Sequence, residues 1–182
     1  LPAGVQRGRQ LGRNRLREVS HQDAAPLTEL FAKPEVSAFL SPPPATPEAF
    51  TEWIELSRSR RLENRAACYS VLDEAERVAG LYMCYRTSPD EPEAELGFAL
   101  APRLWGTGVF APAAHLFIDS LFDRWPLTRL IGRTQARNHR GLGAMRKLGA
   151  TITEQHVRDG EAEFIWAIPR DSWSTIERPR RR

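Results

Sequence analysis

The fold predicted for this chain rests on one stretch, Leu100-Ala101-Pro102-Arg103-Leu104-Trp105-Gly106-Thr107-Gly108-Val109-Phe110. It follows the apolar run 96–100 and precedes residues 114–122, whose apolar side chains recur at the spacing of a helix. A strand, a glycine-containing turn and a helix start in this order point backbone N–H groups and the positive end of a helix dipole at one place. The stretch therefore predicts a site for a phosphate or a pyrophosphate.

The glycines allow more than one interpretation. A P-loop is excluded, because no Gly-Lys-Ser/Thr follows them. Residues 106–111 match the G-x-G-x-x-A pattern of dinucleotide-binding proteins, but that motif requires an acidic residue at a strand end about 20 residues later. The next predicted strand ends in Thr134-Gln135-Ala136, without an acid. A structural turn, in which the glycines serve only the backbone angles, remains open.

The composition is that of one globular domain, which we place at residues 1–182. Hydrophobic residues make up 41% and charged residues 27%, which excludes wholesale disorder. No apolar run reaches the roughly 20 residues of a membrane span, and no signal-peptide pattern opens the chain. We therefore expect a cytoplasmic protein without a membrane partner.

The 26 basic and 23 acidic residues leave a net charge of +3, and the excess arginines lie near both ends. We expect these basic ends, about 1–13 and 177–182, to be flexible. Arginine-rich ends are typical of contacts with RNA, but they are also typical of solvated chain ends. No aromatic residues interleave with the arginines, so stacking on nucleic-acid bases has no support.

Cysteine and histidine are too sparse for a disulfide framework or a metal site. The two cysteines, Cys68 and Cys84, fall on neighbouring predicted strands, and we expect buried free thiols. The four histidines are scattered along the chain without the spacing of metal ligands. The sequence therefore predicts no bound metal.

Periodicity and turn residues predict a mixed order of strands and helices. Strands are expected at 11–20, 66–72, 78–85, 94–100, 129–136, 152–157 and 163–168. Helices are expected at 23–32 and 35–40, from Thr46-Pro47 onward, around 114–122 and at 140–148. This order predicts an α+β domain in which helices flank a mixed sheet.

Residues 103–108 resemble the Q/R-x-x-G-x-G/A element of the GNAT superfamily of acyl-CoA N-acyltransferases, and the tryptophan before the first glycine resembles its ribosomal-protein N-acetyltransferase (RimJ/RimL-like) branch. Three further segments resemble that branch in the same order: 16–36, Glu95-Leu96-Gly97-Phe98 and 138–150. The resemblance covers about residues 14–170. It implies a mostly antiparallel mixed sheet of about seven strands, with a V-shaped gap between the fourth and fifth.

The resemblance also implies a co-substrate, acetyl-CoA or another acyl-CoA. Backbone N–H groups of the glycine turn and the next helix start would bind its pyrophosphate, Arg103 would add a charge, and the last residues of the preceding strand would bind the pantetheine arm. Asn138 is expected to bind the pantetheine and to cap a helix. The expected cofactor-binding residues are Phe98, Leu100, Arg103, Leu104, Trp105, Gly106, Thr107, Gly108, Val109 and Asn138.

Two residues are candidates for the chemistry of acyl transfer to a primary amine by direct attack. Glu95 is the candidate base that takes the proton from the amine, with a solvated sheet glutamate as the alternative. Tyr82 is the candidate acid or acceptor-site residue, with a packed sheet aromatic as the alternative. Gly141 stands where the branch often has a serine that protonates the leaving thiolate.

The sequence does not name the acceptor. An amine-bearing small molecule and a protein N-terminus both fit the expected chemistry, in a monomer or a homodimer. Two alternatives stay open: a regulatory protein that binds acyl-CoA without catalysis, suggested by the missing serine, and an enzyme acting on an RNA-linked amine such as aminoacyl-tRNA, suggested by the basic ends.

Overall fold

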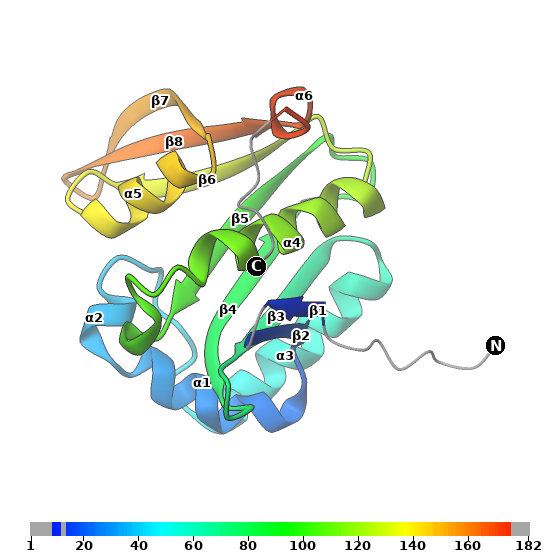
Figure 1. The fold of residues 1–182 in the computed structure, drawn as a ribbon, viewed down its shortest axis with the longest axis vertical. Coiled ribbons are helices and arrows are strands. Elements are labelled where there is room, and N and C mark those ends of the chain that lie inside the picture. Colours follow the sequence, from blue (N-terminus) through cyan, green and yellow to red (C-terminus); the bar gives the residue numbers. More distant parts are fainter. Residues whose placement is uncertain (1–8, 12–13, 176–182) are drawn as a thin grey trace.

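A computed structural model describes residues 9–11 and 14–175 of the 182-residue chain (Figure 1). Most of the predicted flexible ends, namely residues 1–8, 12–13 and 177–182, lies outside the described residues. Cys68 and Cys84 are free and buried, as predicted. No helix in the described part of the chain has the length and apolar character to cross a membrane.

The elements follow the predicted order, with shifts of a few residues at their ends. The strands are β1 (Arg9–Leu11), β2 (Asn14–Glu18), β3 (Ala66–Leu72), β4 (Val78–Tyr85), β5 (Glu93–Leu100), β6 (Arg129–Gln135), β7 (Thr151–Arg158) and β8 (Glu161–Pro169). The helices are η1 (His21–Asp23), α1 (Ala24–Phe31), α2 (Pro34–Ser37), α3 (Pro47–Leu62), η2 (Pro102–Leu104), α4 (Phe110–Arg124), α5 (His139–Lys147) and α6 (Arg170–Trp173).

The strands form one sheet in the order β1-β2-β3-β4-β5-β6-β8-β7, and every neighbouring pair is antiparallel except β5 and β6. The predicted α+β class and the mostly antiparallel sheet are confirmed. The described residues contain eight strands because the three-residue β1 adds an edge next to β2. The single strand expected at 11–20 is therefore two short strands.

The predicted V-shaped gap lies between β5 and β6, which are the fourth and fifth of the seven expected strands. Their parallel pairing joins Glu93–Glu95 to Arg129–Ile131 and goes no further. Beyond it, β5 stays paired with β4 up to Leu100, while β6 stays paired with β8 up to Gln135. The two strands are thus drawn apart by their other neighbours, and the gap opens toward their carboxyl ends (Figure 1).

Helices cover both faces of the sheet. Tyr82 and Tyr85 are three residues apart on β4, so their side chains point to opposite faces. The Tyr82 ring packs on Phe117 of α4, with ring centroids 5.6 Å apart. The Tyr85 hydroxyl lies 3.4 Å from the Ser57 hydroxyl of α3. One face therefore carries α4 and the other carries α3.

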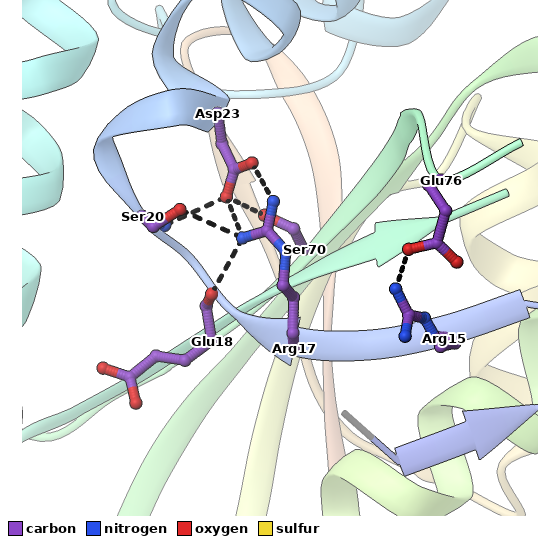
Figure 2. Close-up of polar contacts among 7 residues, drawn as sticks. All are labelled: Arg15, Arg17, Glu18, Ser20, Asp23, Ser70 and Glu76. Atoms are coloured by element: carbon purple, nitrogen blue, oxygen red, sulfur yellow. Dashed lines mark hydrogen bonds and ion pairs between the residues drawn. The ribbon is translucent and has the colours of Figure 1, made fainter. Parts of the chain in front are cut away.

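A buried carboxylate connects the first strands to the first long helix (Figure 2). Asp23 is fully buried and accepts two hydrogen bonds from the guanidinium of Arg17, at 2.5 and 2.7 Å. It also accepts from the Ser20 backbone N–H and the Ser70 hydroxyl, each at 2.9 Å. These contacts join β2, β3 and the start of α1, and they satisfy a charge that is costly to bury alone.

We predict that Asp23→Ala lowers the free energy of unfolding by about 3 kcal/mol, because it leaves Arg17 and Ser70 without their shared acceptor. The control is Glu76→Ala, which removes the exposed ion pair with Arg15 drawn in the same view (Figure 2) and should cost at most about 1 kcal/mol. Urea denaturation measures both. Equal losses of unfolding free energy would show that the buried contacts of Asp23 contribute no more to stability than the exposed ion pair does.

Candidate functional site

A cavity of about 450 Å³ lies where β5 ends, bounded by the glycine turn, the start of α4, one face of α5 and the segment 35–40. Seven of the ten predicted cofactor-binding residues line it: Phe98, Leu100, Leu104, Trp105, Gly106, Gly108 and Asn138. Arg103, Thr107 and Val109 are not among its lining residues. The structure thus brings residues from distant parts of the chain to one place.

The turn before the glycines uses several of its own N–H groups. The Leu104 N–H donates to the Ala101 carbonyl at 2.9 Å, and the Trp105 N–H donates to the Pro102 carbonyl at 3.0 Å. The Thr107 hydroxyl donates to the Leu104 carbonyl at 2.8 Å. These bonds hold the shape of the turn. The N–H groups of Leu104 and Trp105, two of the expected cofactor-binding residues, are therefore already bonded within the turn.

The two glycines adopt a backbone conformation that other residues rarely reach. Gly106 has a φ of 73° and Gly108 a φ of 85°, which is the left-handed region. No atom lies within 4 Å of the position of a Cβ on either residue, so their surfaces are open to the cavity. The first N–H groups of α4, at Phe110 and Ala111, have no partner within the helix. Donors and the helix dipole therefore meet at the cavity.

Two cations of α5 line the same cavity. The guanidinium of Arg140 lies 3.9 Å from the centre of the Trp105 ring, a cation–π contact, and the Trp105 Nε1–H donates to the Leu100 carbonyl at 2.9 Å. Lys147 lies two turns later on the helix. The sequence analysis did not select Arg140 or Lys147. Their spacing of seven residues, which repeats one helix face, is the signal that would have found them.

Asn138 precedes α5 and caps it. Its Oδ1 accepts a hydrogen bond from the Gly141 N–H at 2.9 Å, which confirms the predicted capping role. Both residues line the cavity. The predicted contact of Asn138 with a pantetheine arm stays a prediction.

Arg103 points away from the cavity. Its guanidinium lies 2.9 Å from the Asp73 carboxylate and 3.2 Å from the Val78 carbonyl, at the turn between β3 and β4. Burial tends to raise the pKa of Asp73, but hydrogen bonds from the Arg77 N–H and from Arg103 outweigh it and lower that pKa. Arg103 lines a separate, open hollow of about 570 Å³. In this structure Arg103 therefore does not lie where it was expected to contact a phosphate.

Glu95 is the last residue of β5 that pairs with β6, at the closed end of the gap. Its side chain is about half exposed and lies on the same face of the sheet as Tyr85, its partner on β4. The Arg133 guanidinium contacts the Glu95 carboxylate at 3.3 Å and approaches Glu163 at 3.9 Å. Glu95 therefore lies outside the cavity lining, across the sheet from α4.

Tyr82 lies in the core. It is fully buried, and its hydroxyl donates to the Phe110 carbonyl at 3.0 Å. Its ring packs between Phe98 and Phe117. Burial raises the pKa of Tyr82 well above its usual value. Tyr82 thus has the geometry of the alternative, a packed sheet aromatic. Its hydroxyl connects β4 to the start of α4 and lies away from solvent.

The described residues contain no group of three or more His, Cys, Asp or Glu side chains that is able to hold a metal ion. The charged groups of the cavity wall are the two α5 cations and the Glu35 carboxylate.

Comparisons with known proteins agree with this geometry. Residues 13–151 match the family model described as an acetyltransferase (GNAT) domain. An N-acetyltransferase of Bacillus licheniformis named p20, described as uncharacterized, is 26% identical over 125 residues, which cover 68% of this chain and 70% of the relative.

Solved structures show the same fold. The ribosomal-protein-S5-alanine acetyltransferase of Vibrio fischeri superposes with a TM-score of 0.82 at 16% identity, covering 92% of this chain and 99% of the other. The spermidine N-acetyltransferase of Vibrio cholerae, in complex with CoA and spermine, has a TM-score of 0.76 at 17% identity, covering 89% and 98%. RimJ of Mycobacterium smegmatis, in complex with CoA-disulfide, has a TM-score of 0.76 at 15% identity, covering 87% and 83%.

The similar structures thus include ribosomal-protein and spermidine acetyltransferases, so the RimJ/RimL-like branch is not singled out. At these identities the likeness shows the fold. The family match spans most of the chain, from the second strand through α5, and includes the glycine turn, so this protein belongs to the GNAT acetyltransferase family.

Proposed function

We propose that this protein transfers an acetyl group from acetyl-CoA to a primary amine. The observation that carries the proposal is the cavity at the open end of the gap between β5 and β6, where the glycine turn, the start of α4 and two cations meet. Acetyl-CoA would supply the acyl group as a thioester. The residues of the cavity fit it, because donors and cations suit its phosphates and apolar side chains suit its pantetheine arm.

The phosphate end of the co-substrate would lie against the glycine turn. The N–H groups of Gly106 and Gly108, two glycines that border open space, and the first N–H groups of α4 would donate to a pyrophosphate. Arg140 and Lys147 add positive charge from α5. Because Arg140 is already stacked on Trp105, little side-chain freedom is lost when it binds a phosphate.

The pantetheine end would follow β5 into the gap. Past Glu95, β5 has no partner on its β6 side, so the backbone groups of residues 96–100 that do not bond to β4 face the gap. They would bond the amides of the arm. One N–H of this stretch would also stabilise the oxyanion that forms during attack, a contact whose loss typically costs about 2.7–4 kcal/mol of barrier.

The amine would reach the thioester from the face that carries Glu95. An ammonium must lose a proton before or during attack, and the Glu95 carboxylate, held by Arg133, is our proposed base, directly or through a water molecule. Tyr82 is proposed to position β4 and α4 rather than to exchange protons, because it is buried. With glycine at position 141, water would protonate the departing thiolate.

The acceptor is proposed to be an amine-bearing small molecule or a protein N-terminus. Release of free thiol from acetyl-CoA with a panel of amines separates a catalyst from a regulatory acyl-CoA-binding protein. Including an aminoacyl-tRNA in the panel tests the RNA-linked alternative. The cytoplasmic location and the monomeric or dimeric state remain predictions.

Cofactor binding tests the role of Arg140. Calorimetry should detect acetyl-CoA binding, and Arg140→Ala should weaken it about tenfold, because a charge-assisted contact to phosphate is lost. Arg146→Ala is the matched control, since Arg146 lies on the same helix but not in the cavity wall. Absence of any binding to the unmodified protein would refute the proposed function.

Substitution of Glu95 tests the proposed base. Glu95→Gln should lower turnover about 100-fold or more while the dissociation constant for acetyl-CoA stays nearly unchanged, because only the proton transfer is affected. Glu93→Gln is the control: Glu93 lies two residues earlier on the same face and is paired with Arg129 at 2.6 Å. If both variants keep full turnover, the base must be sought elsewhere.

Substitution of Tyr82 tests whether its hydroxyl serves stability or the reaction. Tyr82→Phe should lower the free energy of unfolding by about 1 kcal/mol, because the Phe110 carbonyl loses a donor. Turnover should fall less than about tenfold. A fall of 100-fold at unchanged stability would instead reinstate Tyr82 as an acid in the reaction.

A further inference from the structure

A row of polar side chains crosses four neighbouring strands on one face of the sheet. It consists of Glu95 on β5, Arg133 on β6, Glu163 on β8 and His156 on β7. The strand register places all four on the same face, because residues opposite each other on paired strands, and residues two apart along one strand, share a face. The α5 helix lies on the other face, where a Cβ on Gly132 would meet the Met145 side chain.

Arg133 bridges the two strands just beyond the point where their backbone pairing stops. It lies two residues past Ile131, the last residue of β6 that pairs with β5. Its Nε–H donates to Oε2 of Glu95 at 3.3 Å. The Glu95 side chain is about half exposed, so this contact is what holds its carboxylate at the closed end of the gap.

Arg133 also faces a second carboxylate. Its Nη1 lies 3.9 Å from Oε2 of Glu163, whose side chain is only 10% exposed. A buried carboxylate needs a donor more than an exposed one does, because water cannot replace a missing partner. Glu163 therefore competes with Glu95 for the same guanidinium.

His156 supplies Glu163 with a nearer partner. Its Nε2 lies 2.9 Å from the same Oε2 of Glu163. Because a carboxylate only accepts hydrogen bonds, Nε2 carries the proton in this contact. Of the two contacts that the Glu163 carboxylate makes with described residues, the one with His156 is the shorter. Arg133 is thereby left to Glu95.

We propose that His156 is a positioning residue for the base of the reaction. By satisfying the buried Glu163 carboxylate, it keeps Arg133 on Glu95, and Arg133 in turn keeps the Glu95 carboxylate at the gap. That Glu95 is the base rests on the proposed function, whereas the competition of two carboxylates for Arg133 does not. His156 acts at a distance, since it is not among the residues that line the cofactor cavity.

Removal of the imidazole tests the role of His156. His156→Ala should lower kcat about tenfold, because the base is misplaced but not removed, and should leave the dissociation constant for acetyl-CoA unchanged. His156→Gln, whose amide nitrogen donates in place of Nε2, should retain most of the turnover. The matched control is His21→Ala, because His21 forms another histidine–glutamate pair, with Glu55 on α3, and should keep full turnover. Full turnover in His156→Ala would refute the proposal.

A second substitution should restore what the first removes. Glu163→Gln takes away the charge that competes for Arg133, so the double variant His156→Ala/Glu163→Gln should return to within about twofold of the original kcat. Purely structural damage would instead grow with the second substitution. Glu163→Gln alone should keep its turnover. A fall of about 100-fold in this single variant would make Glu163 itself the base and would overturn the proposal.

The position of Arg133 can also be followed without any reaction. The ¹H–¹⁵N nuclear magnetic resonance signal of its Nε–H, assigned by its absence in Arg133→Lys, reports on the carboxylate that accepts the bond. The signal should shift in His156→Ala and return toward its original place in the double variant. An unmoved signal would show that the two carboxylates do not compete for Arg133. If the unmodified protein transfers no acetyl group, the proposed function fails, and this signal still decides whether His156 keeps Arg133 on Glu95.

Discussion

The short parallel pairing between β5 and β6 is the constraint on which the site depends. Three residue pairs join the strands at Glu93–Glu95, and beyond them β5 bonds only to β4 and β6 only to β8, so that their other backbone groups face the gap. Because both strands stay in the sheet but separate from each other, the sheet has an opening near its centre. The glycine turn and the cap of α5 lie at the open end.

The two sides of the opening differ in charge. The α4 and α5 side offers a helix start, two glycines with positive φ and the cations Arg140 and Lys147, which together suit an anionic group. Glu95 lies across the sheet and is held by Arg133. The sheet thus separates the part suited to the donor's phosphates from the carboxylate proposed to act on the amine.

Buried polar contacts keep the elements around the opening in register. The Tyr82 hydroxyl fixes the start of α4 against β4, and Asp23 fixes α1 against β2 and β3. Each of these groups is fully buried and hydrogen-bonded, so its loss leaves an unsatisfied partner. Sequence reasoning made Glu95 the candidate base and Tyr82, on the neighbouring strand, the candidate acid or acceptor-site residue. Burial separates them, since only Glu95 is accessible.

The sequence by itself determined the order of elements, the glycine turn between β5 and α4, and the cap at Asn138, because periodicity, positive-φ glycines and capping residues act over a few neighbouring residues. It did not reveal where Arg103 points, which cations line the cavity, or that Tyr82 is buried. Those outcomes were decided by the tertiary structure, since Asp73, Trp105 and Phe110 meet these side chains only after distant segments pack. Local patterns carry no information about such partners.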